Sequence, residues 1–278
     1  MRTPFSYFGS KSRIAPDIWR RFGNPAYYFE PFAGALGALL GRPTTGKHEY
    51  VGDTDCLITN FFRAAKYGDH RKLAKMADWP TSQLDLEART KWLKKQNPRL
   101  HRQLTDDPKW FDLECAAWYA WVQSVRISSN GATIVLGRTA GVRRQSEDLE
   151  TYFAALGNRL KNVVIDYGDW TRMTNAAERN CKRADCAILL DPPYDHSTGR
   201  QKNIYLHDSP DVSAYVRRWA LARAKTHPRL RIALCGYEGE HRMPFSWEEL
   251  PWWSRMGTGK ERIWFSPNCL KVGVEKSA

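Results

Sequence analysis

The stretch ILLDPPYD, residues 188–195, joins a fully apolar run to an acid, two prolines and a tyrosine. A short apolar run of this kind is typical of a strand buried on both faces of a parallel sheet. Pro192 and Pro193 lack backbone N–H groups and have fixed φ angles, so they end the strand and stiffen the chain beyond it. Asp191 and Tyr194 are therefore expected at the carboxyl edge of the sheet, where open α/β sheets bind their ligands.

The rest of the chain indicates an α/β fold with one interruption. Strand-like and helix-like stretches alternate over residues 26–66 and again from residue 161 onward, which is typical of a mostly parallel sheet with helices on both faces. Residues 67–160 are instead helix-rich and carry many Trp and Lys residues, followed by a stretch punctuated by Gly and Ser. We therefore expect one sheet domain formed by residues 1–66 and 161–278, with a mainly helical insertion at 67–160.

The amino-acid composition limits the kinds of binding partner that are expected. The 278 residues are 42% hydrophobic and can bury a full core, and the formal net charge of +13 favours an anionic partner such as nucleic acid. The positive charge is spread along the whole chain, however, and this also fits an ordinary basic protein. Six scattered cysteines, without a C-x-x-C pair, predict free thiols in a reducing cytoplasm and no metal site. No apolar segment is long enough for a membrane span or an export signal, so we expect a cytoplasmic protein.

A second motif, YYFEPFAGALGALLGRP at residues 27–43, combines a strand, an acid and a glycine turn that opens a helix. Glycine lets the backbone approach a ligand closely, and a helix N-terminus offers free N–H groups. Asp53 ends the next predicted strand, where dinucleotide-binding folds place the acid that binds a ribose hydroxyl pair. The spacing of Gly34 and Gly37 is not the dinucleotide fingerprint, and a structural glycine turn with Asp53 as a helix cap is the alternative.

A third motif, FSYFGSKSRIAPDIW at residues 5–19, places two aromatic rings, a Gly-Ser turn and a lysine ahead of an amphipathic helix. The Tyr7 ring and Lys11 can clamp an adenine face and a carboxylate. A packed N-terminal strand with a surface lysine is the alternative.

Together the three motifs resemble those of the DNA adenine-N6 methyltransferases that place the cofactor motif before the D-P-P-Y motif, and in particular their phage-like members. The matching residues are Tyr7, Phe8, Gly9, Ser10 and Lys11, then Glu30, Pro31, Phe32 and Gly34, then Asp53, and finally Asp191, Pro192, Pro193 and Tyr194. The dipeptide Asn130-Gly131 in the insertion and the strand ERIWFS at 261–266 also match. One departure is Leu36, which stands where many members have a second glycine.

The resemblance implies an S-adenosylmethionine-dependent methyltransferase with a Rossmann-like sheet and an inserted target-recognition region. The cofactor, S-adenosyl-L-methionine, would contact Tyr7, Phe8, Gly9, Lys11, Glu30, Pro31, Phe32, Gly34, Asp53, Asp169 and Asp191. For Asp169, in the segment DYGDW at 166–170, a helix cap is an equal alternative. In double-stranded DNA the target adenine must be flipped out of the stack. Asp191 and the Pro192 carbonyl would then accept its amino hydrogens, Pro193 would stiffen the segment, and Tyr194 would stack on the base.

The insertion is expected to contact DNA through Asn130, Arg138, Arg143 and Arg144, and a solvated basic loop is the alternative. The helix at 90–104 is expected to be an exposed amphipathic helix rather than a DNA-contacting face. Methylation of cytosine N4 would use the same D-P-P-Y segment, although those enzymes more often carry Ser at the position of Asp191. The alternative from another class is a non-catalytic nucleic-acid-binding protein. No pattern decides the oligomeric state, for which a monomer is the simpler expectation, or whether the role is restriction–modification.

Overall fold

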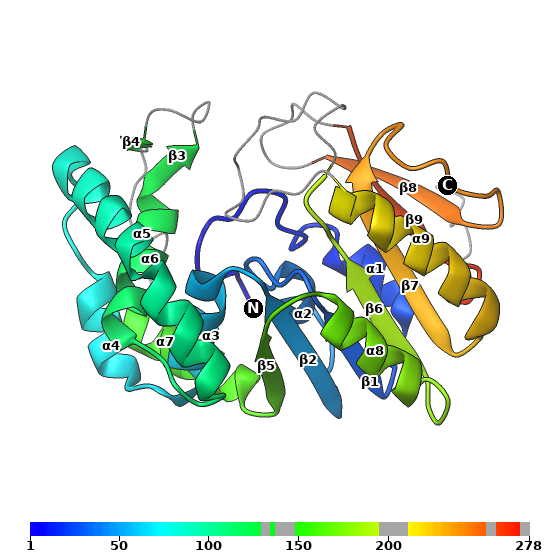
Figure 1. Ribbon diagram of the computed structural model, residues 1–278, viewed down its shortest axis with the longest axis horizontal. Coiled ribbons are helices and arrows are strands. Elements are labelled where there is room, and N and C mark those ends of the chain that lie inside the picture. The colour runs from blue at the N-terminus through cyan, green and yellow to red at the C-terminus, as the bar shows by residue number, and fades with distance from the viewer. Residues whose placement is uncertain (129–133, 137–147, 195–210, 254–259, 273–278) are drawn as a thin grey trace, which may run out of the picture.

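A mostly parallel sheet forms the centre of the molecule (Figure 1). The computed structural model describes residues 1–128, 134–136, 148–194, 211–253 and 260–272, and among these residues seven strands form one sheet in the order β5-β2-β1-β6-β7-β9-β8. The strands are β1 Tyr27–Glu30, β2 His48–Asp53, β5 Val163–Tyr167, β6 Cys186–Leu190, β7 Leu230–Tyr237, β8 Glu248–Trp253 and β9 Lys260–Phe265. The predicted α/β class with a mostly parallel sheet is confirmed.

The strand order places a topological switch point at the middle of the sheet. Strands β5, β2, β1, β6 and β7 are parallel, whereas β9 pairs antiparallel with both β7 and β8. Numbered in chain order, the five parallel strands lie 3-2-1-4-5 across the sheet, a doubly wound order in which the direction of strand addition reverses between β1 and β6. A ligand crevice is therefore expected outside the carboxyl ends of β1 and β6.

Helices cover both faces of the sheet. On one face, Tyr28, Leu189 and Phe265 pack with α1 (Ala15–Phe22), α2 (Gly37–Leu40) and α3 (Cys56–Tyr67). On the other, Phe29, Ile188 and Trp264 pack with α8 (Thr171–Asn180) and α9 (Asp211–Thr226). All five residues of β6 are buried, because both of its faces are covered. The apolar run before Asp191 is thus the doubly covered central strand that its composition predicts.

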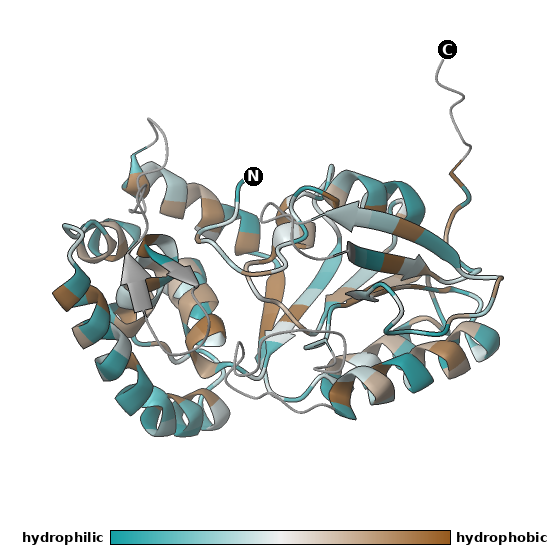
Figure 2. Cartoon of the chain, turned by 90° about the horizontal axis from the view of Figure 1, so that it is seen from above, coloured by the Kyte–Doolittle hydropathy of each residue, from teal (hydrophilic) through white to brown (hydrophobic). Residues whose placement is uncertain are grey.

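The described residues between α3 and β5 form a helical region beside the sheet, on the side of β5 (Figure 1), and the same arrangement can be followed in the view from above (Figure 2). Its elements are α4 His70–Ala77, α5 Gln83–Asp106, α6 Leu113–Val125, β3 Arg126–Ser128, β4 Ile134–Leu136 and α7 Leu149–Leu160, with β3 and β4 forming a two-stranded antiparallel ribbon. The helices begin at acidic or hydroxyl caps, namely Asp69, Ser82, Asp112 and Asp148, whose side chains accept backbone N–H groups. Trp121 and Phe153 join the same hydrophobic core as the helices on the sheet.

The end of the helical region is tied back to the sheet by a buried ion cluster. The Glu49 carboxylate, on β2, accepts hydrogen bonds from Arg42 at 3.0 Å and from Arg159, on α7, at 2.6 Å. Because both glutamate oxygens are engaged, removing either arginine would leave a buried carboxylate underpaired. The cluster therefore fixes where the chain leaves α7 and enters β5.

Candidate functional site

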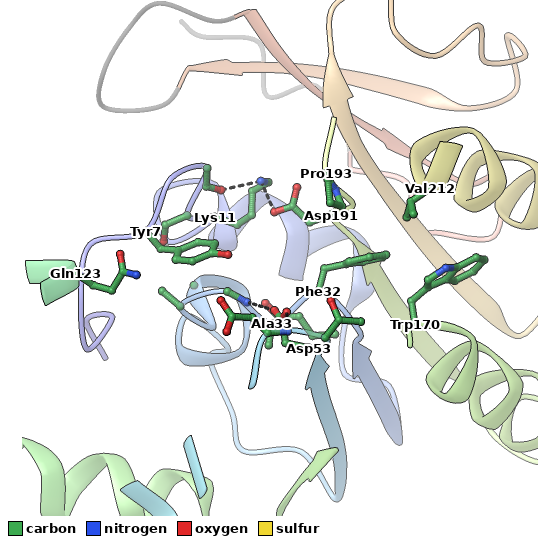
Figure 3. Close-up of a pocket in the computed structure, with 18 of the residues that line it drawn as sticks. Tyr7, Lys11, Phe32, Ala33, Asp53, Gln123, Trp170, Asp191, Pro193 and Val212 are labelled. Carbon is green, nitrogen blue, oxygen red and sulfur yellow. Dashed lines mark hydrogen bonds and ion pairs between the residues drawn. The ribbon is translucent and has the colours of Figure 1, made fainter. Parts of the chain in front are cut away.

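A cavity of about 420 Å³ opens at the carboxyl edge of the parallel strands (Figure 3). Ten of the residues predicted from the sequence line it: Tyr7, Gly9, Lys11, Glu30, Phe32, Gly34, Asp53, Asp169, Asp191 and Pro193. Phe8, Pro31, Pro192 and Tyr194 are not among the described residues that line it. Segments that are far apart in the sequence thus meet at one site, where the strand order predicts a ligand crevice.

Five acids line this cavity, and four of them reach it because each lies at or just beyond the end of a neighbouring parallel strand. Glu30 is the last residue of β1 and Asp53 the last of β2, while Asp191 follows β6 directly and Asp169 comes two residues after β5. Since parallel strands end at the same edge, the acids at or next to the strand ends gather there. A concave site with convergent acids of this kind is the usual form of a small-molecule site in an α/β fold.

Glu30 anchors the glycine turn after β1. Its buried carboxyl accepts hydrogen bonds from the Tyr28 hydroxyl at 2.9 Å and from the backbone N–H of Leu39, in α2, at 3.2 Å. Burial raises the pKa of Glu30 to about 8, against which these two hydrogen bonds and Lys11 act. The residue therefore holds the start of α2 against the end of β1.

The turn itself depends on close approaches at its glycines. Gly34 has a φ of 47°, and a Cβ there would lie 2.8 Å from the Tyr7 ring. Gly37 opens α2, and a Cβ there would lie 2.7 Å from the backbone nitrogen of Ser12. Leu36, the departure from the family pattern, adopts the left-handed conformation with a φ of 57° and is buried. The N-terminal motif therefore packs directly on the turn, and Gly37 matters as much for packing as Gly34.

Asp53 is bound to the same turn. Its carboxylate accepts hydrogen bonds from the backbone N–H of Gly34 at 3.2 Å and of Asp55 at 2.9 Å. Burial, followed by the charge of Asp55, raises its pKa to about 7. The N-cap of α3 is Asp55, which accepts the N–H of Leu57, so the cap function belongs to the later acid and Asp53 faces the cavity.

Asp169 contacts the first residue of α8 and also lies at the cavity, and its predicted contact with the cofactor stays a prediction. Its carboxylate accepts hydrogen bonds from the backbone N–H and the hydroxyl of Thr171, at 2.9 and 2.6 Å, at the start of α8. It also lines the cavity, next to Trp170. Its place in the helix start therefore orients it without removing it from the site.

Lys11 and Asp191 form an ion pair at the cavity wall (Figure 3). The Lys11 ammonium lies 2.5 Å from Asp191 Oδ2, 2.7 Å from the Gly9 carbonyl and 3.2 Å from the Tyr194 hydroxyl. Burial alone would lower the pKa of Lys11, but the Asp191 and Glu261 carboxylates outweigh it and the pKa is raised. Lys11 thus stays charged although its side chain is only 3% exposed.

Tyr194 contacts the cavity residues Lys11 and Asp191 but is not itself among the described residues that line the cavity. Its side chain is 6% exposed, its ring packs edge-to-face on Tyr237, and its hydroxyl donates toward Asp191 Oδ1 at 3.0 Å. In this conformation the tyrosine orients the Asp191 carboxylate. The stacking of Tyr194 on a flipped-out base stays a prediction.

The helical region contributes residues that the motifs did not indicate. Tyr119 and Gln123, on α6, and Arg126, at the start of β3, line the cavity, and Figure 3 shows Gln123 on the side of Tyr7, opposite Trp170 and Val212. Tyr119 is 2% exposed, and among the described residues its hydroxyl makes no hydrogen bond of ordinary geometry. The one available signal was Gln123, a polar residue in an almost wholly apolar helix.

Burial makes the cysteines unsuited to nucleophilic chemistry. All six are buried and free, and burial raises the pKa of Cys56, Cys115 and Cys186 to about 12. Buried thiols of this kind stay protonated and are poor nucleophiles. The groups that can act on a ligand at this site are therefore its carboxylates, Lys11 and the polar side chains of α6.

The predicted DNA contacts Asn130, Arg138, Arg143 and Arg144 lie outside the described residues. Within the described part of the chain, no cluster of three or more His, Cys, Asp or Glu side chains has the arrangement of a metal site. None of the helices in that part has the length and apolar character required to cross a membrane. In comparisons with known proteins, the chain matches no protein-family model and no curated protein.

Proposed function

We propose that this protein is an S-adenosyl-L-methionine-dependent DNA methyltransferase that acts on the N6 amino group of adenine in double-stranded DNA. The observation that carries the proposal is the position of Asp191, directly after the central strand β6 and at the wall of a cavity that Asp53 and Gly34 also line. This cavity lies at the switch point between β1 and β6, where open α/β sheets bind their ligands.

The residues present fit the proposed cofactor. The cavity combines a close backbone approach at Gly34, an acid at the end of β2 and aromatic rings at Tyr7, Phe32 and Trp170. Asp53 would hold the ribose hydroxyls, and the segment around Gly34 would lie along the amino-acid portion. When bound, the cofactor supplies an electrophilic methyl group on a sulfonium.

The chain's own part in the proposed reaction is positioning and electrostatics. An aromatic amino nitrogen is a weak nucleophile because its lone pair is delocalised into the ring. Asp191 would accept a hydrogen bond from that amino group, which draws the lone pair back onto nitrogen. Each carboxylate oxygen has two acceptor sites, so the contacts from Lys11 and Tyr194 leave capacity for this bond.

Arg126 at the cavity and the net charge of +13 favour DNA as the substrate. We propose the cytoplasm as the location, since the six free thiols suit a reducing compartment.

Methyl transfer from radiolabelled cofactor to unmethylated double-stranded DNA tests the proposal. The DNA is digested to nucleosides and separated, with Asp191→Asn assayed in parallel as a nearly isosteric variant. Label in N6-methyladenine that disappears in the variant is the expected result. Label in N4-methylcytosine would overturn the substrate assignment, and cofactor binding without transfer to any DNA would exclude DNA as the acceptor. The lack of both would leave only the nucleic-acid-binding alternative.

A further inference from the structure

The antiparallel strand β9 brings a second carboxylate to the back of the D-P-P-Y segment. Glu261 is the second residue of β9, where it pairs with Tyr237 on β7 and Trp252 on β8. Because β9 runs against its neighbours, its first residues lie at the carboxyl edge of the parallel strands. The Glu261 side chain is 1% exposed.

Glu261 and Asp191 meet at one hydroxyl group. Tyr194 Oη lies 3.0 Å from Asp191 Oδ1 and 3.3 Å from Glu261 Oε2. A tyrosine hydroxyl has a single hydrogen, so Tyr194 donates to one of the two carboxylates at a time. Lys11 Nζ donates to the oxygen of the same hydroxyl at 3.2 Å, which leaves the hydrogen to the carboxylates.

Lys11 connects the same groups from the other side. Its ammonium lies 2.5 Å from Asp191 and 3.9 Å from Glu261, and the Trp252 ring covers it at 5.2 Å. Two carboxylates therefore share one buried ammonium and one hydroxyl hydrogen. In such a network a change at Glu261 must alter how firmly Asp191 is held.

We propose that Glu261 is a positioning residue, which competes with Asp191 for the Tyr194 hydrogen and so keeps Asp191 Oδ1 available as an acceptor for the substrate. The distances alone show that these groups contact one another, whereas the role of the contacts in catalysis rests on the proposed function of Asp191.

A double-mutant cycle in unfolding tests the network without requiring any activity. The four proteins are wild type, Glu261→Gln, Tyr194→Phe and the double variant, each unfolded in denaturant at neutral pH. If the two residues interact, the unfolding equilibrium constant of the double variant will differ from the product of the single effects by about fivefold or more. Glu249→Gln on β8 is the matched control, because Glu249 binds Arg262 and Trp264 and should combine with Tyr194→Phe without coupling. Independent effects of Glu261→Gln and Tyr194→Phe would overturn the proposal.

Methyl-transfer kinetics then test the purpose of the contact. With Tyr194 present, Glu261→Gln should lower kcat about tenfold and leave the KM for the cofactor nearly unchanged. In the Tyr194→Phe background the same substitution should have no further effect on kcat, because the shared hydrogen is gone. An equal loss in both backgrounds would overturn the positioning role. If wild type transfers methyl to no DNA, the proposed function fails, and the unfolding cycle still decides whether Glu261 and Tyr194 are coupled.

Discussion

The sheet edge and the helical region both border the cavity, but they place their side chains by different means. Glu30, Asp53 and Asp191 lie at or next to the ends of parallel strands, so backbone hydrogen bonding within the sheet sets their positions. Tyr119 and Gln123 reach the cavity only because α6 packs against α3 in one particular orientation. Residues placed by the sheet can be located from local sequence patterns, whereas residues placed by helix packing cannot.

Buried polar side chains of α3 hold the helical region in that orientation. Asn60 and Asp112 exchange two hydrogen bonds, from Asn60 Nδ2 to the Asp112 carbonyl at 2.8 Å and from the Asp112 N–H to Asn60 Oδ1 at 2.7 Å. Arg63 donates to the carbonyls of Leu104 and Asp107, at the end of α5. Because hydrogen bonds are directional, these contacts fix the rotation of the helices more tightly than apolar packing would.

The largest expected effect lies at the sheet edge. Asp191→Asn should reduce methyl transfer by about a thousandfold, because the amide is a weaker acceptor and no longer pairs with the Lys11 ammonium. Cofactor affinity, measured by calorimetry, should change by no more than about tenfold. If this variant transferred methyl groups at nearly the wild-type rate, the reacting group would not lie at the sheet edge, and the contrast between the sheet edge and the helical region would fail.

The next effect concerns the glycine turn. Gly34→Ala should weaken cofactor binding by about a hundredfold and destabilise the fold by about 1–3 kcal/mol, because its φ is 47° and the new Cβ would meet the Tyr7 ring. Gly239→Ala is the matched control, since Gly239 has a φ of 82° but open space around it. Thermal unfolding and cofactor titration of both variants separate backbone strain from steric exclusion. Equal losses of affinity in the two would show that the close approach to Tyr7 is irrelevant.

A third prediction concerns pH. Burial raises the pKa of Glu30 from its ordinary 4.5 to about 8, so between these values the folded protein holds a proton that the unfolded chain has lost. The contribution of Glu30 to the free energy of unfolding is therefore fully present below about pH 4.5 and is lost as the pH rises through 8. The total loss amounts to a few kcal/mol, on the order of 1.4 kcal/mol for each pKa unit. Asp53, with a pKa of about 7, acts in the same direction. Urea unfolding from pH 5 to 8.5 should show this slope, and Glu30→Gln should flatten it. If the free energy of unfolding of the variant changed with pH as steeply as that of the wild type, groups other than Glu30 would be responsible for the pH dependence.

The two regions also explain which parts of the fold and of the site could be predicted from the sequence. The run at 186–190 predicted a buried strand, and it placed Asp191 at the sheet edge because the local apolar pattern alone carries that information. The ion pair of Lys11 with Asp191 joins residues 180 positions apart, and no local pattern records it. Lys11 lines the cavity, so its predicted cofactor contact stays a prediction, and its ion pair with Asp191 is an additional contact that the motif did not indicate. In α6, ten of thirteen residues are buried, so the sequence offers no apolar face from which to read which side meets the cavity.

The smallest expected effects lie in the helical region, where one substitution should raise the stability of the protein but lower its affinity for the ligand. Tyr119 keeps a buried hydroxyl that makes no hydrogen bond of ordinary geometry among the described residues, although Gln123 lies close enough to influence its pKa. Removing a buried hydroxyl whose contact with Gln123 falls outside ordinary hydrogen-bond geometry relieves a desolvation penalty, so Tyr119→Phe should stabilise the protein alone by about 1 kcal/mol. If a bound ligand supplies the missing partner, the same variant should bind that ligand about fivefold more weakly. Gln103→Ala on α5, outside the cavity lining, should change neither quantity. A loss of both stability and affinity in Tyr119→Phe would mean that the hydroxyl is already bonded within the protein, and that the helical region only encloses the cavity without contacting its ligand.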